Sequence, residues 1–343
     1  GEMYINGVAG NTFTANTPHL LTAVSMSQRT WATAIGDYWG SASYRRSFIG
    51  DIGEILVYNS ILGSADRQTV EQYLSYKWLG LSVPAPTNVL PTATALVVSN
   101  TAALDLNGIS QEVGSLAGAG AVINGSGAWS TLTVGNDASS TLFSGVVSGS
   151  NALVKVGGGT LTLSGANTYF GSTLVGGGTL TLAGGANRLP AGGVVTVASG
   201  ATLNLNGQAQ TVAGVVGGGS VIGGSLTVAN GTVAPGGIGT VGTLTFSNAP
   251  VLSGTLLIDT RTSGECDLLS VTGGLDVSAL ALQVADVAQM RGISYTVAAC
   301  TGNLTGSFTS ANLPKAWSVR YDRTPGAGKV ILLHKLGTLI SIW

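Results

Sequence analysis

The residue types best suited to bind a ligand gather in one segment near the N-terminus, TWATAIGDYWGSASYRRS, residues 30–47. Aromatic rings stack on the faces of sugar rings, and an arginine guanidinium donates paired hydrogen bonds. We therefore take this segment as a candidate contact for a glycan or another partner, while core packing and strand pairing explain most of its residues equally well. The candidate ligand-binding residues are Trp31, Tyr38, Trp39, Tyr44, Arg45 and Arg46.

Groups that could catalyse a reaction or hold a metal ion are few and scattered. The two histidines, His19 and His334, belong to no cluster with the spacing of metal ligands, so we expect surface or packing roles for both. Residues 237–242, GIGTVG, match the dinucleotide pattern G-x-G-x-x-G, but no helix follows them to present its N-terminus to a phosphate. We predict no catalytic site, no metal and no cofactor, and hence a protein that is not an enzyme.

Carboxylates are too sparse for the paired acids with which glycan-cleaving enzymes work. Asp105 stands between two leucines, in an outward-facing slot of its strand, and we expect a surface position for it. The carboxylates between residues 94 and 260 lie far apart in sequence, at Asp105, Glu112, Asp137 and Asp259.

Five asparagines lie next to glycine turns. They could contact a ligand, or their side-chain amides could bond the backbone at corners of the chain. We favour the second interpretation. The five are Asn107, Asn124, Asn167, Asn187 and Asn206.

The two cysteines, Cys266 and Cys300, fit an exported protein. They could form one disulfide between neighbouring coils or remain two buried thiols. Sequence separation does not decide between these alternatives, because a disulfide depends on the geometry of the folded backbone.

The strands expected in the middle of the chain are built on a repeated sequence motif. The heptad GGGTLTL occurs at residues 157–163 and again at 176–182, a period of 19 residues. Within each copy leucine alternates with threonine, and strand side chains point to opposite faces with period two. One face of each strand is therefore leucine and the other threonine. Strands this short must stack on copies of themselves to bury a core, which predicts a β-solenoid with glycines at its corners.

A longer repeat connects two larger blocks. Residues 103–113, ALDLNGISQEV, align without a gap with residues 202–212, TLNLNGQAQTV, and the offset of 99 residues extends to the glycines and valines near residues 118–125 and 217–224. We interpret the central region as two versions of one block of several coils.

Charge is scarce and unevenly distributed. Charged residues make up 8% of the 343 residues, against about 25% in ordinary globular proteins, and the net charge of −1 offers no basic patch for nucleic acid. Residues 81–260 hold 6 of the 29 charges, while residues 1–80 hold 11 and residues 261–343 hold 12. Glycine and hydroxyl residues interrupt each apolar run before the roughly 20 residues of a membrane span. The middle of the chain therefore differs from its flanks in composition, with far fewer charged residues.

The flanks predict further elements. Asn6 and Gly7 predict a hairpin turn, and the spacing from Ser64, a good N-cap, to Gly80 predicts a helix. We expect residues 81–93 to be a proline-rich linker, 94–285 the solenoid, and 286–335 a C-terminal β cap that covers the open solenoid end. The apolar tail 336–343 is either a last strand of the cap or a sorting or docking signal.

Two stretches resemble known families. Residues 48–81, FIGDIGEILVYNSILGSADRQTVEQYLSYKWLGL, resemble the closing strand and helix of LamG-like, concanavalin A-like jelly rolls. Residues 1–80 are therefore expected to be the C-terminal part of such a β-sandwich, and Gly1 a cut or trimmed end within it. Residues 154–182, VKVGGGTLTLSGANTYFGSTLVGGGTLTL, resemble the autotransporter-associated β-strand repeat, also called the passenger-associated transport repeat.

The second resemblance implies a fold and a setting. It implies a right-handed parallel β-helix that is secreted or displayed on the surface of a Gram-negative-type envelope, in a family usually without enzymatic activity. We therefore expect an all-β, non-catalytic structural or adhesin-type protein whose β-helix is a rigid stalk or an assembly unit. Its expected partners are cell-surface or matrix components, glycans among them, and copies of itself. The alternatives are a carbohydrate-binding protein acting through the LamG-like segment and a β-helical polysaccharide-cleaving enzyme.

Overall fold

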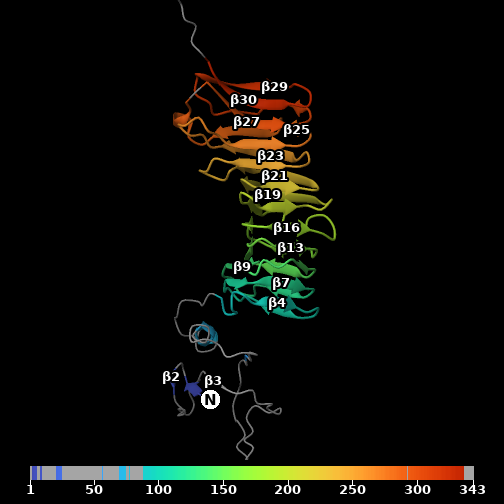
Figure 1. Cartoon of the computed structure of the whole chain (residues 1–343), viewed down its shortest axis with the longest axis vertical. Helices are drawn as coiled ribbons and strands as arrows, with labels where there is room; N and C mark the ends of the chain where they lie inside the picture. Colours follow the sequence, from blue (N-terminus) through green and yellow to red (C-terminus); the bar gives the residue numbers. More distant parts are fainter. Residues whose placement is uncertain are drawn as a thin grey trace, which may run out of the picture. The chain divides into compact units, whose positions relative to one another are not determined.

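The chain divides into two compact units, residues 1–89 and 90–343. The computed structural model describes the backbone of residues 2–5, 8–9 and 21–24, residues 56, 69–74 and 77, and residues 88–335 except Gly292. Figure 1 shows the second unit as a stack of short strands that follow one another along its long axis from β4 to β29. The division between the units falls within the proline-rich stretch 81–93.

The first unit contains a small antiparallel sheet and a helical segment. The sheet has the order β2-β1-β3, formed by β1 (Glu2–Ile5), β2 (Val8–Ala9) and β3 (Leu21–Val24). Ile5 pairs with Val8, as the hairpin predicted at Asn6 and Gly7 requires. Residues 69–74 and 77 are helical, within the range predicted for a helix. The LamG-like character of residues 1–80 stays a prediction, because most of that segment lies outside the described residues.

The second unit is a parallel β-solenoid, as its sequence predicts. One sheet of 12 strands runs along it, and all its pairs are parallel except those of the last two strands, β30 and β29. Ten coils therefore stack in this sheet. Its strands are β4 (Ala95–Val98), β7 (Ser115–Gly118), β10 (Thr141–Phe143), β13 (Thr160–Leu163), β16 (Thr179–Leu182), β18 (Thr202–Asn204), β20 (Ser220–Ile222), β22 (Thr243–Phe246), β24 (Leu268–Val271), β27 (Ser294–Cys300), β30 (Gly328–His334) and β29 (Trp317–Asp322).

Shorter sheets form the other faces of the coils. A sheet of nine strands contains β6 (Gln111–Val113), β9 (Ser130–Val134), β12 (Asn151–Lys155), β15 (Thr173–Val175), β17 (Val194–Val197), β19 (Ala209–Gly217), β21 (Ser225–Pro235), β23 (Val251–Ile258) and β26 (Leu280–Val284). Two further sheets contain β5 (Ala103–Asp105), β8 (Ala121–Ile123), β11 (Val146–Gly149) and β14 (Thr168–Tyr169), and β25 (Leu275–Asp276) with β28 (Leu304–Thr305).

Aliphatic side chains form the core in continuous columns. Leu161 of β13 pairs with Leu180 of β16, which pairs with Leu203 of β18, and none of the three is more than 1% exposed. The threonines between the leucines point outward and are half-buried. The leucine-threonine alternation therefore gives these coils an inner and an outer face, and the 19-residue period sets the register between β13 and β16.

The two blocks that are related by the 99-residue offset share their local conformation but not their place on the solenoid. Asn107 and Asn206 have φ angles of 46° and 49° at equivalent turns. Gly118 and Gly217 both have φ above 100°, and a Cβ atom at either would lie 2.1 Å from a backbone carbonyl oxygen of the coil below. However, β4 lies in the 12-stranded sheet, whereas its counterpart β17 lies in the nine-stranded sheet. The second block is therefore rotated by one face about the axis.

An antiparallel pair closes the C-terminal end. Parallel stacking continues past residue 285, because β27 pairs in parallel with β24. The strands β30 and β29 then add to β27 in antiparallel order. Trp317 packs between Tyr295 and His334, with ring centroids 5.4 and 5.1 Å apart. These strands and rings form the predicted β cap over the last coil.

The leucine columns lead to a stability prediction. Replacing Leu180 by alanine leaves a cavity between two coils, and the free energy of unfolding should fall by about 2–5 kcal/mol. The variant Thr181→Ala is the matched control, because Thr181 is the outward-facing neighbour of Leu180 and its truncation removes little packing. Chemical denaturation of both variants would measure the difference, and equal losses at the two positions would contradict the assignment of faces.

Candidate functional site

The segment that sequence analysis selected for ligand binding lies outside the described residues. This applies to Trp31, Tyr38, Trp39, Tyr44, Arg45 and Arg46, whose role in glycan binding stays a prediction. His19 also lies outside them. Among the described residues, no group of three His, Cys, Asp or Glu side chains could hold a metal ion.

Two buried carboxylates anchor the glycine-rich loop 235–242. Asp267 is fully buried, and its Oδ1 and Oδ2 atoms accept hydrogen bonds from the backbone N–H groups of Gly242 and Asp259, both at 2.8 Å. The Oδ2 atom of Asp259 accepts one from the N–H of Gly239 at 2.6 Å. The loop that matches G-x-G-x-x-G therefore directs two of its N–H groups at side chains of its own chain, and this arrangement leaves those groups unable to hold a phosphate.

Asp267 has the raised pKa of an acid-base catalyst but lacks the access to a substrate that such a catalyst needs. Burial raises the pKa of Asp267 to about 7, within the range of catalytic carboxyl groups. A general acid or base must also reach its substrate, and Asp267 is 0% exposed with both oxygens bonded to backbone. The geometry therefore describes a structural clamp on the loop.

The two cysteines are free thiols in the structure. The Sγ atom of Cys266 lies 3.4 Å from the carbonyl oxygen of Thr296, which it contacts as a donor. Thr296 and Cys300 are four residues apart in β27, a distance of about 13 Å along a strand. Bonded cysteines need Cα atoms within about 7 Å, so a disulfide would require the backbone to move. Burial, with the nearby charge of Asp267, raises the pKa of Cys266 to about 11, which suppresses its reactivity.

The asparagines act at corners, as the second interpretation of the sequence predicted. Asn107, Asn187 and Asn206 have positive φ angles at turns. Asn124 and Asn167 are buried and bond the backbone of neighbouring coils, as in the 2.9 Å hydrogen bond from the N–H of Val147 to Asn167 Oδ1. Asp105 is exposed and accepts hydrogen bonds from the N–H groups of Asn107 and Gly125. Turn chemistry accounts for these side chains.

Glutamine performs the same role at two equivalent positions. Gln111 bonds both the N–H and the carbonyl oxygen of Leu90, at 2.9 and 3.0 Å. Gln210, 99 residues later and 1% exposed, bonds the N–H and the carbonyl oxygen of Leu189 at 3.0 and 2.9 Å. Each side-chain amide therefore pairs with the backbone N–H and carbonyl groups of a residue on the preceding coil, as a neighbouring β-strand would.

Lys155 is a buried polar residue that was not among the residues predicted to be functional, and it is 1% exposed. Its Nζ atom donates to the carbonyl oxygens of Val156, Gly157 and Gly177 at 2.6, 3.0 and 3.2 Å, and burial lowers the pKa of the ammonium group. The signal was present in the sequence. Leu153 points inward, so strand alternation places Lys155 inward too.

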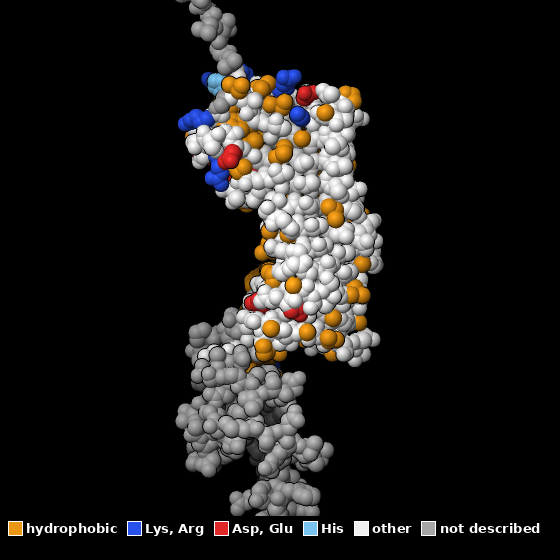
Figure 2. Space-filling view, viewed as in Figure 1, with side chains coloured by type: hydrophobic (Ala, Val, Ile, Leu, Met, Phe, Trp, Pro, Cys, Tyr) orange, Lys and Arg blue, Asp and Glu red, His pale blue; other side chains and the backbone are white. Residues whose placement is uncertain are grey.

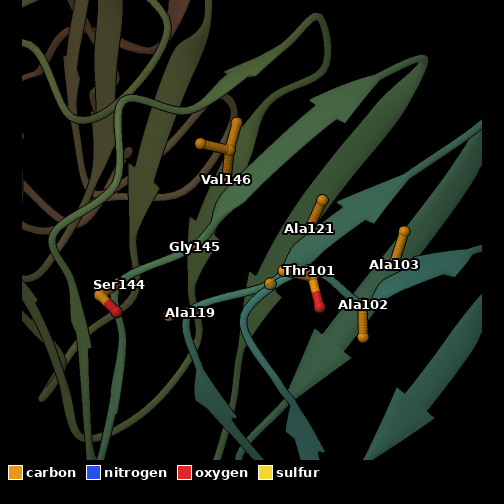
Figure 3. Close-up of a pocket in the computed structure, with 9 residues that line it drawn as sticks. Thr101, Ala102, Ala103, Ala119, Ala121, Ser144, Gly145 and Val146 are labelled. Carbon is orange, nitrogen blue, oxygen red and sulfur yellow. The ribbon is translucent and has the colours of Figure 1, made fainter.

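A shallow trough of about 360 Å³ lies at a corner of the first three coils (Figure 3). Ala103, Ala121 and Val146, on neighbouring strands, point to the same side of it. Its only polar side chains are Thr101 and Ser144, and none of its residues titrates. The trough can accept small apolar groups but supplies no groups for catalysis.

Charged side chains gather at the C-terminal end of the solenoid. On the face shown in Figure 2 they surround β27 to β30, while the middle coils show mainly white and orange atoms. No helix in the described part of the chain is long and apolar enough to cross a membrane.

Part of the solenoid matches a known repeat family. Residues 153–182 match the model of the Passenger-associated-transport-repeat family, and these residues form β12 to β16 of the solenoid. No curated protein matches the chain. The repeat match and the stacked coils together fit the autotransporter repeat that the sequence resembles, and they indicate a surface-associated structural protein.

The glutamine contacts predict a local loss of stability. Gln210→Ala would leave the buried N–H and carbonyl oxygen of Leu189 without their side-chain partner, which costs about 1–3 kcal/mol. Gln208→Ala, two residues earlier and partly exposed, should have a small effect. Thermal and chemical unfolding of the two variants would test this, and a neutral Gln210→Ala would show that the contact is not needed.

The buried Asp267 predicts a pH dependence. Its folded pKa of about 7 lies above the ordinary 3.8, so the folded state holds a proton that the unfolded state has lost, and stability should fall as pH rises from about 4 to 7. The slope from one group is at most about 1.4 kcal/mol per pH unit. The stability difference between wild type and Asp267→Asn should change across this range, while that for Asp276→Asn should not follow the same course. A constant difference for Asp267→Asn would contradict the prediction.

Proposed function

We propose that this protein is a non-catalytic structural component of a bacterial cell surface, in which the solenoid acts as a rigid stalk or an assembly unit. The observation that supports this most is the unbroken stack of ten parallel coils, together with the repeat match at residues 153–182. Ten coils at about 4.8 Å each give a rod of about 50 Å. Within the solenoid, the buried carboxylates, the buried amides and Lys155 bond the chain's own backbone.

The finer parts of the proposal concern location and output. The repeat family supports export to the surface of a Gram-negative-type envelope, where a neutral rod would serve adhesion or the assembly of an outer layer or filament. Exposed apolar side chains on outward strand positions support contacts with other molecules: Val97 is 65% exposed and Leu142 54% exposed on the same sheet.

Surface display has a direct test. When intact cells of the producing bacterium are treated with a protease that cannot enter them, the chain should be cleaved, while a cytoplasmic marker stays whole. Immunogold labelling of intact cells should find it outside. Protection until the cells are lysed would refute the proposed location.

Assembly and catalysis are separable by experiment. Sedimentation over a range of concentrations should show reversible association if the rod is an assembly unit. A monomer at all concentrations would exclude the assembly role and leave only the role of a rigid stalk. Turnover of any polysaccharide by the purified chain would contradict the non-catalytic assignment.

A further inference from the structure

Two exposed aromatic side chains lie on the body of the solenoid. Trp129, immediately before β9, is 63% exposed, and Phe170, immediately after β14, is 71% exposed. The other aromatic residues between 90 and 260, Phe143, Tyr169 and Phe246, are at most 2% exposed. The two exposed rings therefore stand apart from the core and are available to a ligand.

Strand register places both rings in one column. The parallel pairing of β9 with β12 and of β11 with β14 puts Trp129, Ser150 and Phe170 on three successive coils, one after another along the solenoid axis. Adjacent parallel strands lie about 4.8 Å apart, so the two rings are separated by about 10 Å along the axis. We call these three residues the aromatic column.

The residues beside the aromatic column on its own coils are small and neutral. Arg188 lies on the coil that follows Phe170, and its guanidinium donates to carbonyl oxygens of its own turn, those of Gly184 and Gly185. Half-exposed Ser150 separates the rings, and the register of β15 with β17 places Gly192 on the next coil after Phe170. A Cβ atom at Gly192 would meet nothing within 4 Å, so no bulky group covers that side. The sequence has no charged residue from 138 to 154 or from 156 to 187. A charged ligand would find no ionic partner in these two stretches.

We propose that the aromatic column binds an extended chain of neutral hexoses laid along the solenoid axis. The apolar faces of hexose rings stack on aromatic side chains. Two coils of the solenoid span about the length of a disaccharide unit in an extended chain, so Trp129 and Phe170 contact every second sugar and Ser150 lies beside the sugar between them. The solenoid is then a glycan-contacting surface in itself. The site does not depend on the proposed structural role, which stands without it.

The test uses the full chain and cellohexaose, which is long enough to reach both rings. Isothermal titration calorimetry should detect binding to the wild type, and Trp129→Ala and Phe170→Ala should each weaken it by about tenfold. Trp129→Phe should retain most of the affinity. Ile238→Ala removes another exposed apolar side chain, 74% exposed, and should leave binding unchanged. Hexagalacturonate, a charged chain of the same length, should bind more weakly.

Three outcomes would overturn the proposal. The first is no binding of cellohexaose, laminarihexaose or mannohexaose to the wild type. The second is binding that survives in both alanine variants, for which thermal unfolding would show that the solenoid is intact. The third is binding that is lost in Trp39→Ala but not in Trp129→Ala, which would assign the sugar contact to the segment 30–47.

Discussion

The structure depends on one constraint: most strands of the solenoid have only two to five residues and cannot bury a core alone, so each coil needs the backbone and the side chains of the next. Backbone hydrogen bonds run along the axis from coil to coil, and the inward leucines and valines meet in columns between them. The loss of either interaction would remove the other, because the columns align only while the register holds. The antiparallel strands β30 and β29 end this series by offering the last parallel strand a partner that does not continue the coil.

The corners impose the second requirement, since backbone groups that turn away from the ladder still need partners. Glycines and asparagines with positive φ make the turns, and buried amides complete the bonds: Asn124 and Asn167 at some corners, Gln111 and Gln210 at others. At the loop 235–242, Asp259 and Asp267 do the same with carboxylates, and Lys155 does it with an ammonium group. The polar groups that look chemically active in this part of the chain are therefore the ones that allow a coil to bend.

The sequence predicted the solenoid and the faces of its strands because the alternation of Leu161 and Leu163 with threonine is local and period two is unambiguous. The corner role of Asn124 and Asn167 was predictable because both stand close to glycines that mark turns. The buried acid Asp267 was not, because its partners lie 8 and 25 residues away and the folded path of the loop decides them. Nor was the rotation of the second block by one face predictable. Local sequence specifies a strand and its turn, but the lengths of all the preceding coils together decide on which face of the solenoid a strand lies. The aromatic column likewise depends on register, because Trp129 and Phe170 are distant in sequence and only the stacking of coils places them in one column.

These constraints explain how the chain can be a surface structure with so little charge: its stability comes from repetition, and its outer face stays free for hydroxyl groups and a few exposed rings. Pulsed electron spin resonance tests the stack most directly, with spin labels at outward positions of one column and Cys266 and Cys300 replaced by alanine. Thr160 and Ser270 are five strands apart in the 12-stranded sheet, and Thr160 and Thr245 four. The account predicts backbone separations of about 24 and 19 Å, a difference of one strand spacing for 25 residues of sequence. Equal separations, or a difference far from one spacing, would contradict a stacked solenoid.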